Sequence, residues 1–166
     1  MSFATRTFML NRVNAARLAQ LACPADRDMV DDEAIRIAIA GGDLSGYSEA
    51  DQTTISLALD AIDAALADAD ALIMTYGIPE TVQTTLLARI ASTIALYYLQ
   101  GVGRMTDDVQ KAYEGVIDTL KSHSKGVLSL IPPDPALTVS DALAGAEISS
   151  GSSRYSGWNE DDGDWW

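Results

Sequence analysis

The stretch PETVQTTLLARIASTIALYYLQG, residues 79–101, decides which fold the sequence predicts, because it combines helical spacing with almost no charge. After Glu80, its only charged residue is Arg89. Its large apolar residues recur at steps of three and four, namely Leu86, Ile90, Ile94 and Tyr97, with Leu87, Ala91, Ala95 and Tyr98 beside them. This apolar arc is wider than a surface helix needs. We therefore expect a helix over 79–101, with Pro79 in its first turn and Gly101 at its end, buried on most sides.

A membrane span is the alternative for this stretch. A bilayer demands about 20 predominantly apolar residues in a row. Polar and charged residues interrupt the run at Gln83, Thr84, Thr85, Arg89, Ser92 and Thr93. The stretch is therefore interpreted as the central helix of a protein core, and no membrane contact is expected.

Two further long helices are predicted on either side of the central one. The helix over 48–76 begins with Ser48-x-x-Asp51, which resembles a capping box, and ends at Gly77. Its apolar stripe consists of Ile55, Leu59, Ile62, Leu66, Ala69, Ile73 and Tyr76. The third long helix is expected over 106–125, and shorter helices over 3–22 and 31–40. The predicted fold class is all-α, a bundle of three long helices with short N-terminal helices.

The composition changes after Gly126, which suggests two parts. Residues 1–126 form the predicted helical domain, and 127–166 form an extended tail rich in Pro, Ser and Gly, with seven acids and one base. The aromatic residues of the tail are Tyr155, Trp158, Trp165 and Trp166. Three interpretations stay open: the tail folds back on its own body, docks onto a neighbouring subunit or partner, or is disordered.

The charge is strongly negative and unevenly distributed. The chain has 24 acidic and 11 basic residues, a net charge of −13, yet residues 1–25 contain Arg6, Arg12 and Arg17 and no acid. Such a body is unsuited to general nucleic-acid binding, because Lys and Arg make the phosphate contacts. An acidic surface can still let DNA pass without binding it.

Four acids on the helix over 48–76 share one side of it. At 100° per residue, Glu49, Asp60, Asp63 and Asp70 fall within an arc of about 80°. Asp60, Asp63 and Asp70 can in principle hold a divalent cation, but acids on one helix face are usually solvated. Arg89, on the following helix, is either buried against such an acid or extends its stem to the surface.

No catalytic or cofactor motif is present in the sequence. His123, the only histidine, is placed near a helix end, and Cys23, the only cysteine, excludes an intrachain disulfide and a conventional zinc site. There is no phosphate-binding glycine motif and no nucleophile elbow. The N-terminus lacks a long apolar segment typical of a signal peptide. We expect no enzyme activity, no cofactor and no metal.

Several short motifs carry a resemblance to a known family. In chain order they are Phe3-Ala4-Thr5, Met9-Leu10-Asn11-Arg12-Val13, the alanine-rich Ala58–Tyr76 ending in Tyr76-Gly77-Ile78-Pro79, Ala95-Leu96-Tyr97-Tyr98-Leu99, the set Tyr113, Leu120, Gly126 and Leu128, and Ser153-Arg154-Tyr155. Their order and spacing resemble the head–tail connector (adaptor) proteins of Mu-like phages and prophages. The resemblance covers residues 3–22 and 52–130, whereas the acidic insert at 24–50 and the Trp-ended tail depart from it.

The resemblance implies a structural virion protein without catalytic residues. Such adaptors form a ring, usually of twelve copies, beneath the portal, and join the capsid to a tail-side stopper or tail terminator protein while DNA passes through. This places the protein in the virion neck, and in the host cytoplasm during assembly. Candidate contacts to subunits or partners are Arg6, Arg12, Arg17, Arg154, Tyr155, Trp158, Trp165 and Trp166. The stripe Glu49, Asp60, Asp63 and Asp70 is the candidate channel-facing surface. The alternative function is an acidic helical regulator or DNA mimic that binds a basic partner.

Overall fold

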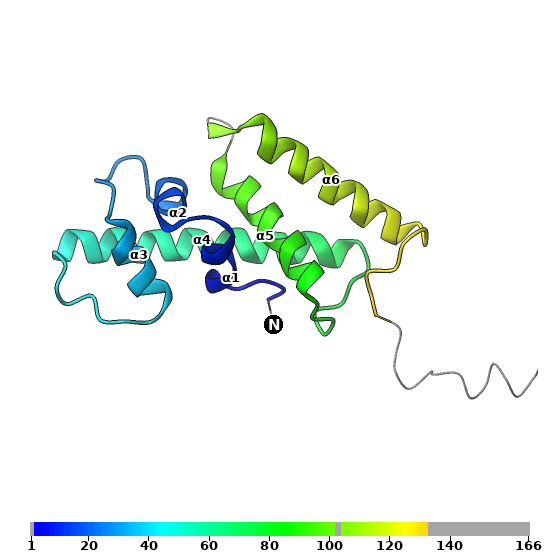
Figure 1. Cartoon of the computed structure of the whole chain (residues 1–166), viewed down its shortest axis with the longest axis horizontal. Helices are drawn as coiled ribbons and strands as arrows, with labels where there is room; N and C mark the ends of the chain where they lie inside the picture. The colour runs from blue at the N-terminus through cyan, green and yellow to red at the C-terminus, as the bar shows by residue number, and fades with distance from the viewer. Residues whose placement is uncertain (1, 102–103, 133–166) are drawn as a thin grey trace, which may run out of the picture. The chain divides into compact units, whose positions relative to one another are not determined.

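The computed structural model describes residues 2–101 and 104–132, and these two ranges contain six α-helices and no β-strand (Figure 1). The helices are α1 (Arg6–Arg12), α2 (Ala15–Ala22), α3 (Asp32–Ile39), α4 (Glu49–Thr75), α5 (Thr85–Gln100) and α6 (Asp107–Ser124). The prediction of an all-α fold is confirmed. One compact unit ends at Pro132. The predicted tail from residue 133 onward lies outside the described residues.

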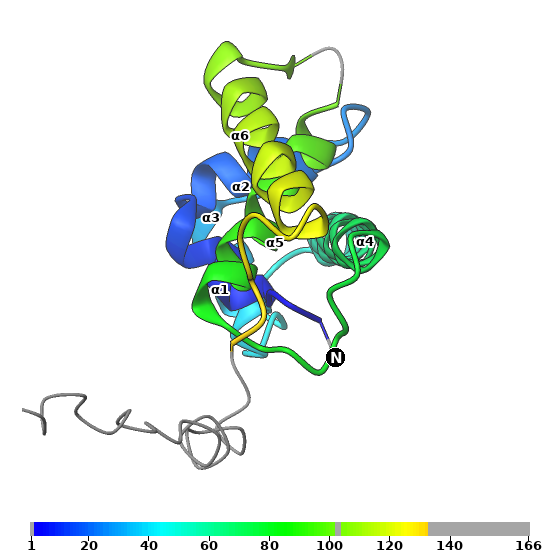
Figure 2. The ribbon, with the colours of Figure 1, turned by 90° about the vertical axis from the view of Figure 1, so that its right-hand side faces the viewer.

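The longest helix, α4, is the element against which the others are assembled. It has 27 residues and is therefore about 40 Å long. The main partner of α4 is α5, while α6 packs on α5, and α2 and α3 contact both each other and α4. Figure 2 looks nearly along the axis of α4 and shows the other helices gathered on one side of it. One face of α4 therefore has no helical neighbour within the described part of the chain.

The buried face of α4 is the apolar stripe that the sequence predicts. Ile55, Ile62, Leu66, Ala69 and Ile73 are all buried. The other stripe residues, Leu59 and Tyr76, are partly buried and pack against the same core. Removing such side chains from water is the largest stabilising contribution to folding, roughly 25 cal/mol per Å² of apolar surface.

The central helix begins later than predicted. It starts at Thr85, and not in the turn after Pro79. The Thr84 hydroxyl accepts a hydrogen bond of 3.1 Å from the backbone N of Leu87, which caps the helix. The preceding residues form a turn in which the Val82 N–H donates to the Pro79 carbonyl at 3.0 Å, and Ile78 is buried. Burial of Ile78 holds the chain in this turn, which prevents the helix from starting at Pro79.

Local capping signals place the other helix ends. The Asn14 side chain caps α2 by accepting a hydrogen bond of 2.8 Å from the Arg17 N–H, and Ser48 caps α4 by accepting one of 3.1 Å from the Asp51 N–H. At the other end of α4, Gly77 adopts a φ of +85°, a conformation that favours glycine. The bounds of α4 and α6 consequently lie within one residue of those predicted from the sequence.

Leu130, which the sequence assigns to the tail, belongs to the core of the described unit, where it is only 5% exposed. Its backbone N–H donates a hydrogen bond of 3.2 Å to Nδ1 of His123, near the end of α6. The single histidine therefore fastens the segment after α6 to that helix. This contact gives His123 a structural role in the described unit.

Candidate interaction surfaces

Two of the four acids expected to face a channel hold the N-terminal segment against α4. Arg6 Nε donates to Asp63 Oδ1 at 2.7 Å, and Arg6 Nη2 donates to Asp63 Oδ2. This hydrogen bonding is the main cause of the raised pKa of Arg6. Asp70 Oδ1 accepts a hydrogen bond of 3.1 Å from the backbone N of Phe3, a residue that belongs to the core. Asp63 and Asp70 thus have structural roles that the sequence pattern did not indicate.

The other two acids, Glu49 and Asp60, are exposed on the open face of α4. They are about 20° apart around the helix, on the side opposite the buried stripe. Leu57 and Met74, each 40% exposed, flank the same side. Between them lie small exposed residues such as Ala64. The open face therefore offers carboxylates beside apolar and small side chains, and a neighbouring helix can approach it closely.

A second surface brings together two arginines from distant parts of the chain. Arg12, at the end of α1, crosses α5, and its Nη1 donates to the Arg89 carbonyl at 2.7 Å, to Ser92 Oγ at 2.7 Å and to Thr93 Oγ1 at 3.1 Å. The pKa of Arg12 is lowered, first by partial burial and then by the positive charge of Arg89. The two guanidinium groups are therefore close enough to repel each other.

These arginines line a groove of about 300 Å³ between α5 and α6. On α5 the groove contains Leu86, which is 49% exposed, together with Ile90, and on α6 it contains Val116. The Arg89 side chain is exposed, which agrees with the interpretation that its stem reaches the surface. Within the described part of the chain, no carboxylate forms an ion pair with Arg12 or Arg89. We call this surface the arginine groove.

The remaining predicted contact residues are partly accounted for. Arg17 lies on α2 and its Nη1 donates to Gln20 Oε1 at 3.4 Å, a contact within one helix. Gln20 also receives a hydrogen bond at its carbonyl from Arg104, which ties the start of the α6 segment to α2. The predicted contacts in the tail, Arg154, Tyr155, Trp158, Trp165 and Trp166, lie outside the described residues.

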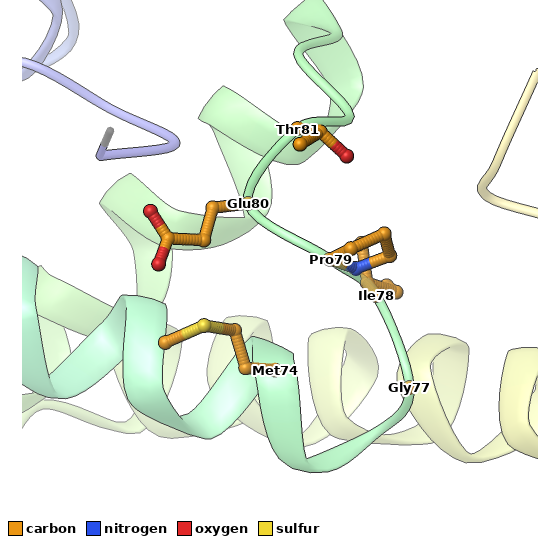
Figure 3. A pocket seen from close by; sticks show the side chains of 6 residues that line it. All are labelled: Met74, Gly77, Ile78, Pro79, Glu80 and Thr81. Atoms are coloured by element: carbon orange, nitrogen blue, oxygen red, sulfur yellow. The ribbon is translucent and has the colours of Figure 1, made fainter.

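A larger hollow of about 620 Å³ lies at the turn between α4 and α5 (Figure 3). Figure 3 shows the side chains of Met74 and Glu80 pointing to the same side of the turn, away from Pro79 and Thr81. Among the described residues that line it, Glu80 is the one titratable side chain.

Three tyrosines form a cluster where α5 meets α6. The rings of Tyr97 and Tyr113 are stacked with centroids 3.8 Å apart, and Tyr98 lies edge-on to Tyr97. Partial burial, followed by the influence of Tyr113, raises the pKa of Tyr98 to about 12. The negative charge of Asp68 on α4 also contributes to this shift.

The described residues contain no group of three or more His, Cys, Asp or Glu side chains arranged to hold a metal ion. No helix among them is long and apolar enough to span a membrane. Cys23 is buried, as expected for a small core residue. The open face of α4 and the arginine groove are two described surfaces that combine exposed apolar and charged side chains and can contact another molecule.

A family model covers most of the chain. Residues 3–147 match the model described as Bacteriophage Mu, Gp36. The chain belongs to this family. The sequence-based resemblance to proteins of Mu-like phages is therefore confirmed at the level of the family, and membership indicates a structural or assembly role in a phage. A search of curated proteins finds no match.

Proposed function

We propose that the protein is a head–tail connector, whose copies form a ring that joins the capsid to the tail and lets DNA pass. The match to the Bacteriophage Mu, Gp36 family over residues 3–147 carries the proposal, because it covers all six helices. The proposed partners are further copies of the chain, the portal protein, and a tail-side stopper or tail terminator protein. The proposed location is the virion neck, with assembly in the host cytoplasm.

The surfaces of the described unit support a role in assembly and not in catalysis. A subunit of a ring needs two different contact surfaces, since each copy touches a neighbour on either side. The open face of α4 and the arginine groove are two such surfaces, and they differ in charge. We accordingly propose no chemical step and no cofactor for this protein.

The proposed DNA path is lined by fewer acids than the sequence pattern suggests. Asp63 is paired with Arg6, and Asp70 binds the backbone of Phe3, so neither presents a carboxylate free of a protein partner. Glu49 and Asp60 remain exposed. Because the open face of α4 serves as a contact between copies, Asp60 lies within that contact, and Glu49 at the start of α4 is the acid left to repel phosphate around the ring.

Electron microscopy of assembled particles tests the proposal most directly. The full-length chain is mixed with the portal protein of the same phage, and the mass of each complex is measured in solution before imaging. A portal of the same phage that lacks its tail-facing surface serves as the control. Appearance of a closed ring of this protein on the intact portal supports the connector function, and its absence on the intact portal overturns it.

The alternative function, an acidic regulator or DNA mimic, gives a different result in the same experiment. The exposed Glu49 and Asp60 favour it, because a row of carboxylates can imitate phosphates. A regulator of this kind binds a basic partner as one or two copies and never joins the portal. Absence from purified virions, together with one-to-one binding to a basic host protein, selects the alternative.

A further inference from the structure

The positive charge of the arginine groove is not neutralised by a carboxylate from the described part of its own chain. Two guanidinium groups lie together on it, and no described carboxylate pairs with either. The exposed side chain of Leu86 is beside them. Such a combination of positive charge and exposed apolar surface is suited to a segment that carries carboxylates next to apolar groups.

The open face of α4 has that composition. Asp60 is exposed at the middle of the face, Glu49 is exposed at its start, and Leu57 and Met74 are exposed along it. Small residues such as Ala64 leave room for the long arginine side chains of another molecule. The two surfaces are therefore complementary in charge and share an apolar character.

The two surfaces also face different ways on the same molecule. Arg89 lies in the groove between α5 and α6, and the described residues that line this groove come from α1, α5 and α6 and not from α4. The open face of α4 in turn points away from the other helices (Figure 2).

We propose that the arginine groove of one copy binds the open face of α4 of the next copy, with Arg12 and Arg89 meeting Asp60. This inference rests on the proposed connector function and names the contact that builds its ring. Complementary surfaces on opposite sides of one chain produce a head-to-tail interface, which closes into a ring when the rotation between copies allows it. Each copy then uses one acidic and one basic surface.

The size of the contact predicts how assembly proceeds. A helix face about 40 Å long and about 10 Å wide covers roughly 400 Å², about half of the ~800 Å² that each partner contributes to a standard interface. Two isolated copies should therefore associate weakly. Ring closure, or a portal that holds copies side by side, raises their effective concentration and stabilises the contact.

A charge-exchange experiment tests this pairing on the full-length chain. Arg89→Glu and Asp60→Lys are made separately and together. We expect each single change to weaken ring assembly by about tenfold, since it places like charges opposite each other, and the double variant to recover most of the loss. Arg27→Glu is the matched control, because Arg27 is exposed in the loop after α2 and has the same change of charge.

Arg89→Glu should fold, since the Arg89 carbonyl, and not its side chain, receives the hydrogen bond from Arg12. Asp60→Lys places a second positive charge near Arg6, but it leaves the hydrogen bonds between Arg6 and Asp63 in place. Circular dichroism verifies this before assembly is measured. If the wild-type chain forms rings and both single variants form them equally well, the pairing is wrong while the connector function stands. If Arg89→Glu loses assembly and the double variant does not recover it, the arginine groove binds another acidic segment and not the open face of α4. If the wild type does not associate even when the portal protein is present, both proposals fall.

Discussion

The ion pair between Arg6 and Asp63 allows the sharpest test of which acids on α4 stabilise the fold and which are available to contact another molecule. Arg6 donates through two nitrogens, Nε and Nη2, to the two carboxylate oxygens. The side chains are 35% and 50% exposed, so water screens the attraction. Exposed pairs contribute about 0.2–1 kcal/mol, and the bidentate geometry places this one near the upper end. We therefore expect a coupling energy of about 1 kcal/mol.

The measurement is a double-mutant cycle with Arg6→Gln and Asp63→Asn, followed by urea denaturation with circular dichroism. The cycle isolates the pairwise energy from the separate effects of each substitution. A loss of about 1 kcal/mol corresponds to roughly 4 °C in the melting temperature for a domain of this size. The coupling should decline in high salt, because screening weakens an exposed pair.

Asp60→Asn is the matched control for this cycle. Asp60 is exposed on the same helix, and its charge contributes to the raised pKa of Arg6, but the hydrogen bonds and the ion pair of Arg6 within the described residues go to Asp63. We expect its substitution to change stability by less than about 0.5 kcal/mol. A coupling below about 0.3 kcal/mol between Arg6 and Asp63, or equal effects of Asp60→Asn and Asp63→Asn, would refute the division of the acids into two groups.

Three further predictions concern the helices themselves. Leu120→Ala should destabilise the chain by about 3 kcal/mol in urea denaturation, because Leu120 is the one buried side chain of α6, whereas Val127→Ala, at 79% exposure, should have almost no effect. Thr84→Ala should lower the free energy of unfolding by about 1 kcal/mol, because it removes the N-cap of α5, and Thr81→Ala should lower it by less. The two variants would not differ in this way if the helix began at Pro79. The pKa of Tyr98 is raised from 10.0 to about 12 in the folded chain, so its contribution to the free energy of unfolding is intact below pH 10 and is lost as the pH rises toward 12. Tyr98→Phe should reduce this loss of stability, as measured by thermal melts at alkaline pH.

Local signals explain why much of the helical framework could be predicted. Ser48 and Asn14 are capping residues whose side chains accept hydrogen bonds from nearby backbone N–H groups. The stripe on α4 is regular over about six turns, from Ile55 to Tyr76, so a helix is the only regular structure that gathers it on one side. Both signals depend on residues a few positions apart, and sequence alone contains them.

The start of α5 could not be decided in this way. Pro79 is compatible with a first helical turn, and Thr84 is an equally good cap. The choice depends on burial of Ile78, which packs into the core. That packing involves residues far along the chain, so the tertiary structure settles where the helix begins.

The surfaces were predicted less well than the helices for a related reason. A helical wheel correctly groups Asp63 and Asp70 with Asp60, but it cannot show that the N-terminal segment lies against part of that arc. The arginine groove unites Arg12 with Arg89, which are 77 residues apart in sequence. Neither position alone indicates the other.

The acidic side chains have two different roles, which the net charge of the chain does not reveal. Asp63 and Asp70 hold the N-terminal segment, and Asp51 helps to close the first turn of α4 with Ser48. These carboxylates would stay in place whatever the chain binds. The charged groups left for contact with another molecule include both signs of charge. An acidic chain whose copies repel one another at long range can still associate if Arg12 and Arg89, which have no carboxylate partner among the described residues, meet an acid of the next copy, so attraction at one contact must exceed general repulsion.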